Sequence, residues 1–132
     1  MKLYHGSPQK LDSLEPRQGK GINDFQNQKA IFCGDNFEIA ALFAIGKQLK
    51  GITSFGVNKK LVIVGNHELN PGYVYEFETN NFKKHKKEYA VFEKITKMKT
   101  CVVKPEDYKD KIFFIDNKDK LYKSLGIKPP KK

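Results

Sequence analysis

Short apolar runs, each ended by glycine, proline or a polar stretch, constrain the fold of this chain more than any other feature. The runs are four to seven residues long, and several alternate apolar with polar residues, which is typical of β-strands. Only one segment repeats apolar residues at the i, i+3, i+4 spacing of a long helix. Many strands with one clear helix predict an α+β fold rather than a parallel βαβ sheet. The predicted strands are 2–5, 30–33, 61–64, 73–77, 89–95, 100–103 and 112–115.

The helix is predicted to follow Asp35 or Asn36, either of which can accept a hydrogen bond as its N-cap. It should end between Gly46 and Gln48. Residues 17–28 are polar with few apolar anchors, so we expect a mobile loop, a kind of segment that often carries function. Turns or connections are expected at 6–8, 51–58, 66–72, 80–87 and 105–111.

The chain has 132 residues, of which 39% are hydrophobic, and this size suits one domain with one core. We expect that domain to span 1–125, with a short helix at 118–125 and a flexible basic tail at 126–132. No apolar run is long enough to cross a membrane, and the N-terminus does not resemble a signal peptide. Two cysteines are too few for a disulfide scaffold. We therefore expect a soluble cytoplasmic protein.

A formal net charge of +10 favours contact with polyanions, because a cationic surface gains affinity for phosphate by releasing counterions. Of the 25 basic residues, however, only Arg17 is an arginine, so guanidinium contacts that read guanine edges are scarce. Lysine supplies an attractive field with little sequence readout. A lysine-rich composition scattered over a solvated surface explains the charge equally well.

Several familiar catalytic signatures are absent from the sequence. There is no GxxxxGK[ST] loop, no GxGxxG, no HExxH and no GxSxG. The three histidines lie far apart at positions 5, 67 and 85, so we expect no metal site. His5 ends the first predicted strand just before Gly6, where a side chain can point into a cleft and a backbone amide can approach a ligand. A structural role for a single histidine is the simpler interpretation of this position.

Three separated pieces resemble the poly(ADP-ribose) polymerase and diphtheria-toxin branch of the ADP-ribosyltransferases. Residues 3–7, Leu-Tyr-His-Gly-Ser, are similar to its first signature. Residues 28–43, an apolar strand followed by a Gly-Asp break and a helix with Ala-Ala-Leu-Phe, resemble its second. Residues 88–93, Glu-Tyr-Ala-Val-Phe-Glu, look like the strand that opens with the catalytic glutamate. The order and approximate spacing agree over residues 3–93.

The resemblance implies an ADP-ribosyltransferase-like fold of split antiparallel β-sheets, with few short helices and a cleft for NAD as substrate. His5 would hydrogen-bond the adenosine ribose, and the Gly6 backbone would pair with the nicotinamide carboxamide. Glu88 would be catalytic, stabilising positive charge on the ribose in an oxocarbenium-like transition state. The remaining expected contacts with NAD come from Tyr4, Ser7, Ile31, Phe32 and Phe43, the last two as rings around the nicotinamide.

Two positions depart from the family pattern. The tyrosine of the second signature is replaced, because Ile31 or Phe32 falls where its ring would be. Ala40 lacks a hydroxyl that relatives use on the carboxamide. A different nucleotide substrate is therefore an alternative to NAD. Glu88 also has the simpler interpretation of a surface acid paired with Lys84 or Lys87, and its rivals for the catalytic role are Glu76, Glu78 and Glu93.

Three functions stay open from the sequence. The first is an NAD-dependent mono-ADP-ribosyltransferase acting on a macromolecule, either a protein or an RNA or DNA that the basic surface would concentrate. The second is an NAD glycohydrolase that transfers ADP-ribose to water. The third is a non-catalytic nucleotide-binding or nucleic-acid-binding module of the same fold. The sequence does not specify the oligomeric state.

Overall fold

The computed structural model describes residues 1–19, 24–47, 53–56, 60–65 and 67–115. Within them lie one α-helix, α1 (Phe37–Gly46), and one 3₁₀-helix, η1 (Pro105–Tyr108). The strands are β1 (Lys2–Ser7), β2 (Arg17–Gln18), β3 (Lys29–Cys33), β4 (Thr53–Gly56), β5 (Lys60–Val64), β6 (Gly72–Glu78), β7 (Lys83–His85), β8 (Glu88–Val91), β9 (Lys99–Val103) and β10 (Ile112–Ile115).

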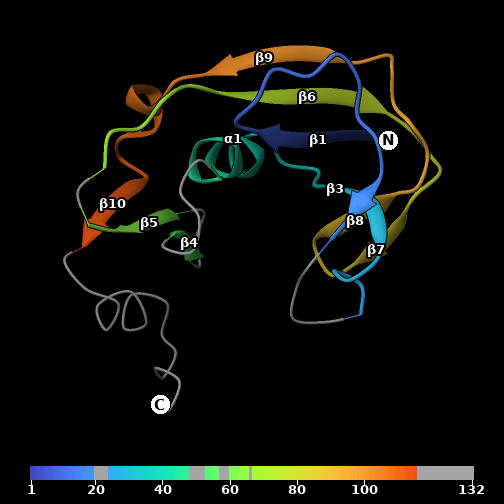
Figure 1. Ribbon diagram of the computed structural model, residues 1–132, viewed down its shortest axis with the longest axis horizontal. Helices are drawn as coiled ribbons and strands as arrows, with labels where there is room; N and C mark the ends of the chain where they lie inside the picture. Colours follow the sequence, from blue (N-terminus) through green and yellow to red (C-terminus); the bar gives the residue numbers. More distant parts are fainter. Residues whose placement is uncertain (20–23, 48–52, 57–59, 66, 116–132) are drawn as a thin grey trace.

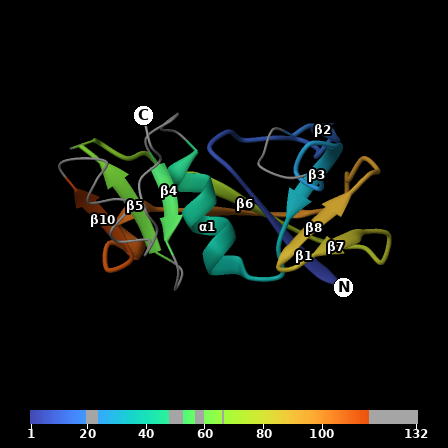
Figure 2. The ribbon, with the colours of Figure 1, turned by 90° about the horizontal axis from the view of Figure 1, so that it is seen from below.

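The strands form three sheets around the helix. Strands β1, β6 and β9 make one sheet in the order β1-β6-β9, and this sheet runs across the top of the molecule with α1 beneath it (Figure 1). Seen from below, α1 lies between the other two sheets, β10-β5-β4 and β2-β3-β8-β7 (Figure 2). The α+β class predicted from the sequence is confirmed.

Among the described residues, every strand pairing is antiparallel except that of β10 with β5, which is parallel with Ile112 opposite Leu61. A parallel pair needs a long crossover between its strands, and here the chain between them includes β6 through β9. Three of the antiparallel pairs, β2-β3, β4-β5 and β7-β8, join strands that are neighbours in the chain. The sequence pattern did not predict the parallel pair.

Helix α1 packs directly on the backbone of the β1-β6-β9 sheet. A Cβ atom added at Gly6 would collide with the Ala40 carbonyl and would lie 2.9 Å from the Ala44 nitrogen. A Cβ atom added at Gly72 would lie 2.8 Å from the Ala44 Cβ. Small residues on both partners therefore let helix and sheet approach more closely than larger side chains would allow. The resulting core also holds Leu42, Ile45, Leu61, Ile63, Val74 and Val103.

A second core lies on the opposite face of the β1-β6 pair. It holds Leu3, Leu14, Ile31, Tyr75, Phe77, Tyr89, Val91 and Ile95. Tyr75 is fully buried, and its hydroxyl donates to the Gln9 carbonyl at 2.9 Å and accepts from the Leu11 N–H at 2.5 Å. The alternation of β6 thus serves two cores, with Val74 facing the helix and Tyr75 facing the second cluster.

The structure corrects several predicted boundaries. Strand β1 continues through Gly6 and Ser7 instead of stopping at His5, because β6 offers partners as far as Tyr73. The predicted strand 89–95 begins at Glu88 and ends at Val91. Four segments expected as turns or loops contain β2, β4, β7 and η1. The expected helix at 118–125 and the tail at 126–132 lie outside the described residues, and the single domain of 1–125 stays a prediction.

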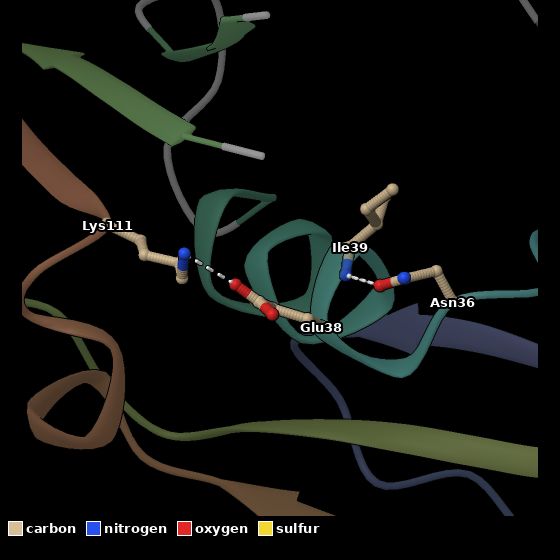
Figure 3. A network of polar contacts seen from close by, with 4 residues as sticks. All are labelled: Asn36, Glu38, Ile39 and Lys111. Atoms are coloured by element: carbon tan, nitrogen blue, oxygen red, sulfur yellow. Dashed lines mark hydrogen bonds and ion pairs between the residues drawn. The ribbon is translucent and has the colours of Figure 1, made fainter. Parts of the chain in front are cut away.

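Two polar contacts stabilise the first turn of α1 (Figure 3). Asn36 is the N-cap, as expected of that position or Asp35, and its side-chain oxygen accepts from the Ile39 N–H at 3.0 Å. Glu38 forms an ion pair with Lys111 at 3.0 Å, which links the helix to the start of β10. In the part of the chain that the structure describes, no helix is long and apolar enough to cross a membrane.

We predict that Gly6→Ala destabilises the protein by more than about 3 kcal/mol. The new methyl group on β1 would collide with the backbone of α1, which cannot move away as a flexible side chain could. Gly34→Ala is the matched control, since a Cβ atom there meets nothing within 4 Å. Urea unfolding of both variants measures the difference. Equal free energies of unfolding for the two variants would contradict the close packing of α1 on β1.

Candidate functional site

The site begins where strands β1 and β3 separate. Tyr4 and Gly34 exchange two backbone hydrogen bonds, of 2.8 Å and 3.0 Å, and form an isolated bridge between the β1-β6-β9 sheet and the β2-β3-β8-β7 sheet. Beyond this bridge the two strands do not pair. A side chain makes the next link, because the His5 ring nitrogen Nδ1 lies 2.7 Å from the Phe32 carbonyl oxygen. The bridge and this contact define the closed end of a split between two sheets.

Two adjacent pockets lie along the split, one on each face of β1. Alternation along the strand turns His5 and Ser7 to one face, and Tyr4 and Gly6 to the other. The first face borders a pocket of about 450 Å³, and the second borders a pocket of about 580 Å³. Gly19, Phe32 and Lys47 line both pockets, so the pockets meet at these residues. We call them the His5 pocket and the Glu88 pocket.

The Glu88 pocket brings together five of the residues predicted from the sequence. These come from four different elements, so only the tertiary fold could place them side by side. They are Tyr4 and Gly6 of β1, Phe32 of β3, Phe43 of α1 and Glu88 of β8. Phe43 is exposed, although the residues next to it in α1 are buried. An exposed ring at a pocket wall can stack on a planar ligand.

The His5 pocket contains the other predicted residues. His5, Ser7 and Ile31 line it together with Phe32. Ser7 is buried, and its hydroxyl accepts a hydrogen bond from the Gln9 N–H at 3.1 Å, so the Ser7 hydroxyl also stabilises the turn after β1. Ile31 is only 3% exposed and belongs to the second core. Ile31 and Phe32 are the two residues that could replace the tyrosine of the second signature, and Phe32 is therefore the more available to a ligand.

Glu88 is held by a residue that the sequence pattern did not single out. The Gln26 side-chain nitrogen donates to both Glu88 carboxylate oxygens, at 2.9 Å and 3.3 Å. Gln26 precedes β3 in the polar part of the chain, and its side chain lines the Glu88 pocket. The Gln26 amide restricts the orientation of the carboxylate.

The surroundings of Glu88 differ from those of a surface acid paired with a neighbouring lysine. Within the described residues Glu88 forms no ion pair with Lys84 or Lys87: Lys84 lies over the Tyr89 ring, and Lys87 lines the same pocket as Glu88. The three rival acids line neither pocket. Glu76 pairs with Lys2 at 3.9 Å, and Glu93 accepts from the Thr79 hydroxyl at 3.3 Å.

His5 is a neutral hydrogen-bonding group. Burial, helped by the nearby charges of Lys47 and Arg17, lowers the pKa of His5 from 6.5 to about 4, although its contact with Phe32 opposes the shift. A carbonyl oxygen can only accept, so the nitrogen facing Phe32 carries the proton. The other nitrogen, Nε2, is then an acceptor. A ligand hydroxyl is the kind of group that it can bind.

Gly6 presents its backbone to the open edge of β1. Because Tyr4 turns its N–H and C=O toward Gly34, alternation turns those of Gly6 toward the same edge. The Lys47 ammonium donates to the Gly6 carbonyl at 3.1 Å and lies 5.6 Å from the centre of the Phe43 ring. Burial of this ammonium group lowers the pKa of Lys47. Gly6 thus has a backbone N–H that can donate to a ligand amide, and a carbonyl that already accepts from Lys47 but has a second lone pair.

Cys33 lines the Glu88 pocket, but it is a poor nucleophile there. Burial raises the pKa of the Cys33 thiol from 9.0 to about 12, so the reactive thiolate is scarce at neutral pH. Among the residues that the structure describes, no group of three or more His, Cys, Asp or Glu side chains could hold a metal ion. Besides Cys33, the ionisable side chains that line this pocket are Tyr4, Asp35, Lys47, Lys87 and Glu88.

Three further residues of the cleft were not predicted from the sequence. Gln26, Arg17 and Lys47 contact or border it, and each lies in or next to a segment without a recognisable motif. The polar composition of 17–28 predicted a functional loop but not which side chain would reach Glu88. Arg17 was distinctive only as the single arginine.

Comparison with known proteins adds no further evidence: no family model, no curated protein and no solved structure matches this chain.

We predict that the low pKa of His5 makes the fold sensitive to acid. The unfolded chain takes up a proton near pH 6.5, whereas folded His5 does so only near pH 4, so stability falls as the pH drops through this window. The loss should approach roughly 3 kcal/mol. His5→Asn keeps an amide N–H near Phe32 and carries no charge at any pH. Thermal unfolding of both proteins from pH 7 to pH 4 should show a smaller loss for His5→Asn, and parallel losses would contradict the burial of a neutral His5.

Proposed function

We propose that this protein is an NAD-dependent mono-ADP-ribosyltransferase with an ADP-ribosyltransferase-like fold, and that it transfers ADP-ribose to a macromolecular acceptor. The observation that carries the proposal is the composition of the Glu88 pocket. The Glu88 carboxylate, an open backbone edge at Gly6 and three aromatic rings line one pocket, which joins a second pocket containing His5. The resemblance of residues 3–7, 28–43 and 88–93 to the family supports the same assignment.

The two-pocket geometry suits a dinucleotide. NAD consists of two nucleosides joined by a diphosphate, and the two pockets meet beside the cationic side chain of Lys47. We place the nicotinamide riboside in the Glu88 pocket and the adenosine in the His5 pocket. The diphosphate then lies near Lys47, with Arg17 at the far wall. A neutral His5 with an accepting Nε2 matches the hydroxyls of the adenosine ribose.

Positioning of the nicotinamide rests on Gly6 and the two phenylalanines. The Gly6 N–H can donate to the carboxamide oxygen, and a carbonyl has two lone pairs, so the Gly6 C=O can bind the carboxamide NH₂ beside Lys47. Phe32 and Phe43 supply ring faces that attract the cationic nicotinamide ring. Lys47 lies over Phe43, and we propose that it turns to the diphosphate when NAD binds.

The reaction breaks the bond between ribose C1′ and the nicotinamide nitrogen. Nicotinamide leaves with the bonding electron pair, and positive charge develops on the ribose in an oxocarbenium-like transition state. The Glu88 carboxylate stabilises this charge more strongly in the transition state than in bound NAD, so it increases the rate. The acceptor then attacks C1′ and releases its proton, for which Glu88 is the available base. Gln26 keeps the carboxylate oriented.

We predict that Glu88→Gln lowers the rate of ADP-ribose transfer by at least about 100-fold and changes the Kd for NAD by only a few fold, because the carboxylate acts mainly in the transition state. Transfer of labelled ADP-ribose and calorimetric titration with NAD measure the two quantities. The matched control is Glu93→Gln, since Glu93 is exposed and lines neither pocket. Equal rates for both variants would remove Glu88 from catalysis, and free ADP-ribose without labelled acceptor would identify a glycohydrolase.

We predict that Lys47→Met weakens NAD binding by about tenfold, because the diphosphate loses a cationic partner in a partly desolvated cleft. The effect should shrink as ionic strength rises. Lys104→Met removes the same charge from an exposed position and should leave the Kd unchanged. Tighter binding by Lys47→Met would show instead that Lys47 competes with the nicotinamide over Phe43.

A further inference from the structure

A basic hairpin stands beside the Glu88 pocket. Residues 83–87 read Lys-Lys-His-Lys-Lys and are all exposed. The sequence predicted only a charged connection here, whereas the structure forms strand β7, a two-residue turn and strand β8. Lys86 in the turn has a φ of 56°, which fits a tight hairpin. We call residues 83–87 the basic hairpin.

No carboxylate within the described part of the chain forms an ion pair with these four lysines. Two of them lie over aromatic rings instead, Lys83 at 5.5 Å from the Phe92 ring centre and Lys84 at 5.3 Å from that of Tyr89. Phe92 is itself 40% exposed. The hairpin thus combines positive charge that stays available to a partner with a large ring at the surface.

The basic hairpin leads directly into the pocket. Lys87 lines the Glu88 pocket, and Glu88 is the next residue along the chain. His85 lies opposite Glu88 in the β7-β8 register, and its ring stacks on Phe25 with centroids 5.3 Å apart. Phe25 in turn makes an edge contact with Phe32, a wall of both pockets. A polyanion bound along the hairpin would therefore end at the mouth of the pocket.

We propose that the basic hairpin docks a single-stranded nucleic acid and presents it to the Glu88 pocket as the acceptor. Surfaces that bind single strands combine a cationic track for the phosphates with aromatic rings on which bases stack. The four lysines supply the track, and the exposed Phe92 ring supplies a stacking face beside the hairpin. Lysine rather than arginine predicts binding with little preference for sequence. The acceptor role rests on the proposed function, whereas the docking itself does not.

Lysines on an edge strand have a second physical explanation. Strand β7 is the last strand in the order β2-β3-β8-β7, and charged side chains on such an edge prevent pairing with another molecule. The two explanations predict different results. Loss of edge protection causes self-association and leaves oligonucleotide binding unchanged, whereas loss of a docking surface weakens oligonucleotide binding in a protein of unchanged oligomeric state.

The first test measures binding of a labelled single-stranded 20-nucleotide probe of mixed sequence by fluorescence anisotropy over a series of salt concentrations. The variant replaces Lys83, Lys84 and Lys86 with glutamine and keeps Lys87, because Lys87 lines the Glu88 pocket. The control replaces three exposed lysines near β9 and η1 with glutamine, Lys97, Lys99 and Lys104, and so has the same net charge. We expect the hairpin variant to lose at least about tenfold in affinity and to reduce the slope of log K against log salt by about 2. Equal binding by the hairpin variant and the control would overturn the docking proposal, as would stronger binding of polyglutamate than of the probe.

The second test separates docking from catalysis. Labelled NAD is given to the full chain together with the oligonucleotide and an equal mass of a mixture of folded proteins. We expect label on the oligonucleotide, a loss of at least tenfold in that label for the hairpin variant, and unchanged NAD binding by calorimetry. Label on protein alone would overturn the nucleic-acid acceptor while leaving the transferase intact. Absence of NAD binding would instead overturn the proposed function, and the anisotropy result would still decide whether the hairpin docks nucleic acid.

Discussion

The candidate site depends on one bridge between two sheets. Tyr4 and Gly34 exchange two hydrogen bonds and then their strands diverge, so β1 keeps an open edge for the rest of its length. An open edge leaves backbone N–H and C=O groups without a strand partner, and such groups need another partner when they are shielded from water. The His5 side chain satisfies one of them on the β3 side, at Phe32. The Lys47 ammonium donates to the Gly6 carbonyl, and we propose that a ligand amide pairs with the Gly6 backbone at this edge.

This constraint also accounts for the residues around the split. Gly6 has to be small because α1 packs on its backbone, and the same contact brings Phe43 and Lys47 to the open edge. His5 is kept neutral by burial beside cationic groups, which makes it an acceptor for hydroxyls and not a charged partner for phosphate. Glu88 arrives from β8 through its pairing with β3. Packing of the helix and the site are therefore consequences of one arrangement.

The sequence predicted the features that local physics determines. The strand at 30–33 and the helix after Asn36 have apolar patterns and a cap that specify them without the rest of the chain. Strands β4 and β7 were not predicted, because their residues are polar or weakly patterned and become strands only through pairing with β5 and β8. The cleft residues in the three signatures could be proposed in advance. Gln26 could not, because its contact with Glu88 joins positions 62 residues apart and has no local pattern.

We propose that NAD spans the split with its nicotinamide beside Glu88. A crystal structure with an NAD analogue whose nicotinamide–ribose bond resists cleavage tests this placement most directly. We expect the carboxamide on the Gly6 backbone, the nicotinamide ring against Phe32 and Phe43, and the adenosine ribose hydroxyls on the Nε2 of His5. An analogue bound away from the open edge of β1, or a crystal grown with excess analogue that leaves both pockets empty, would contradict it.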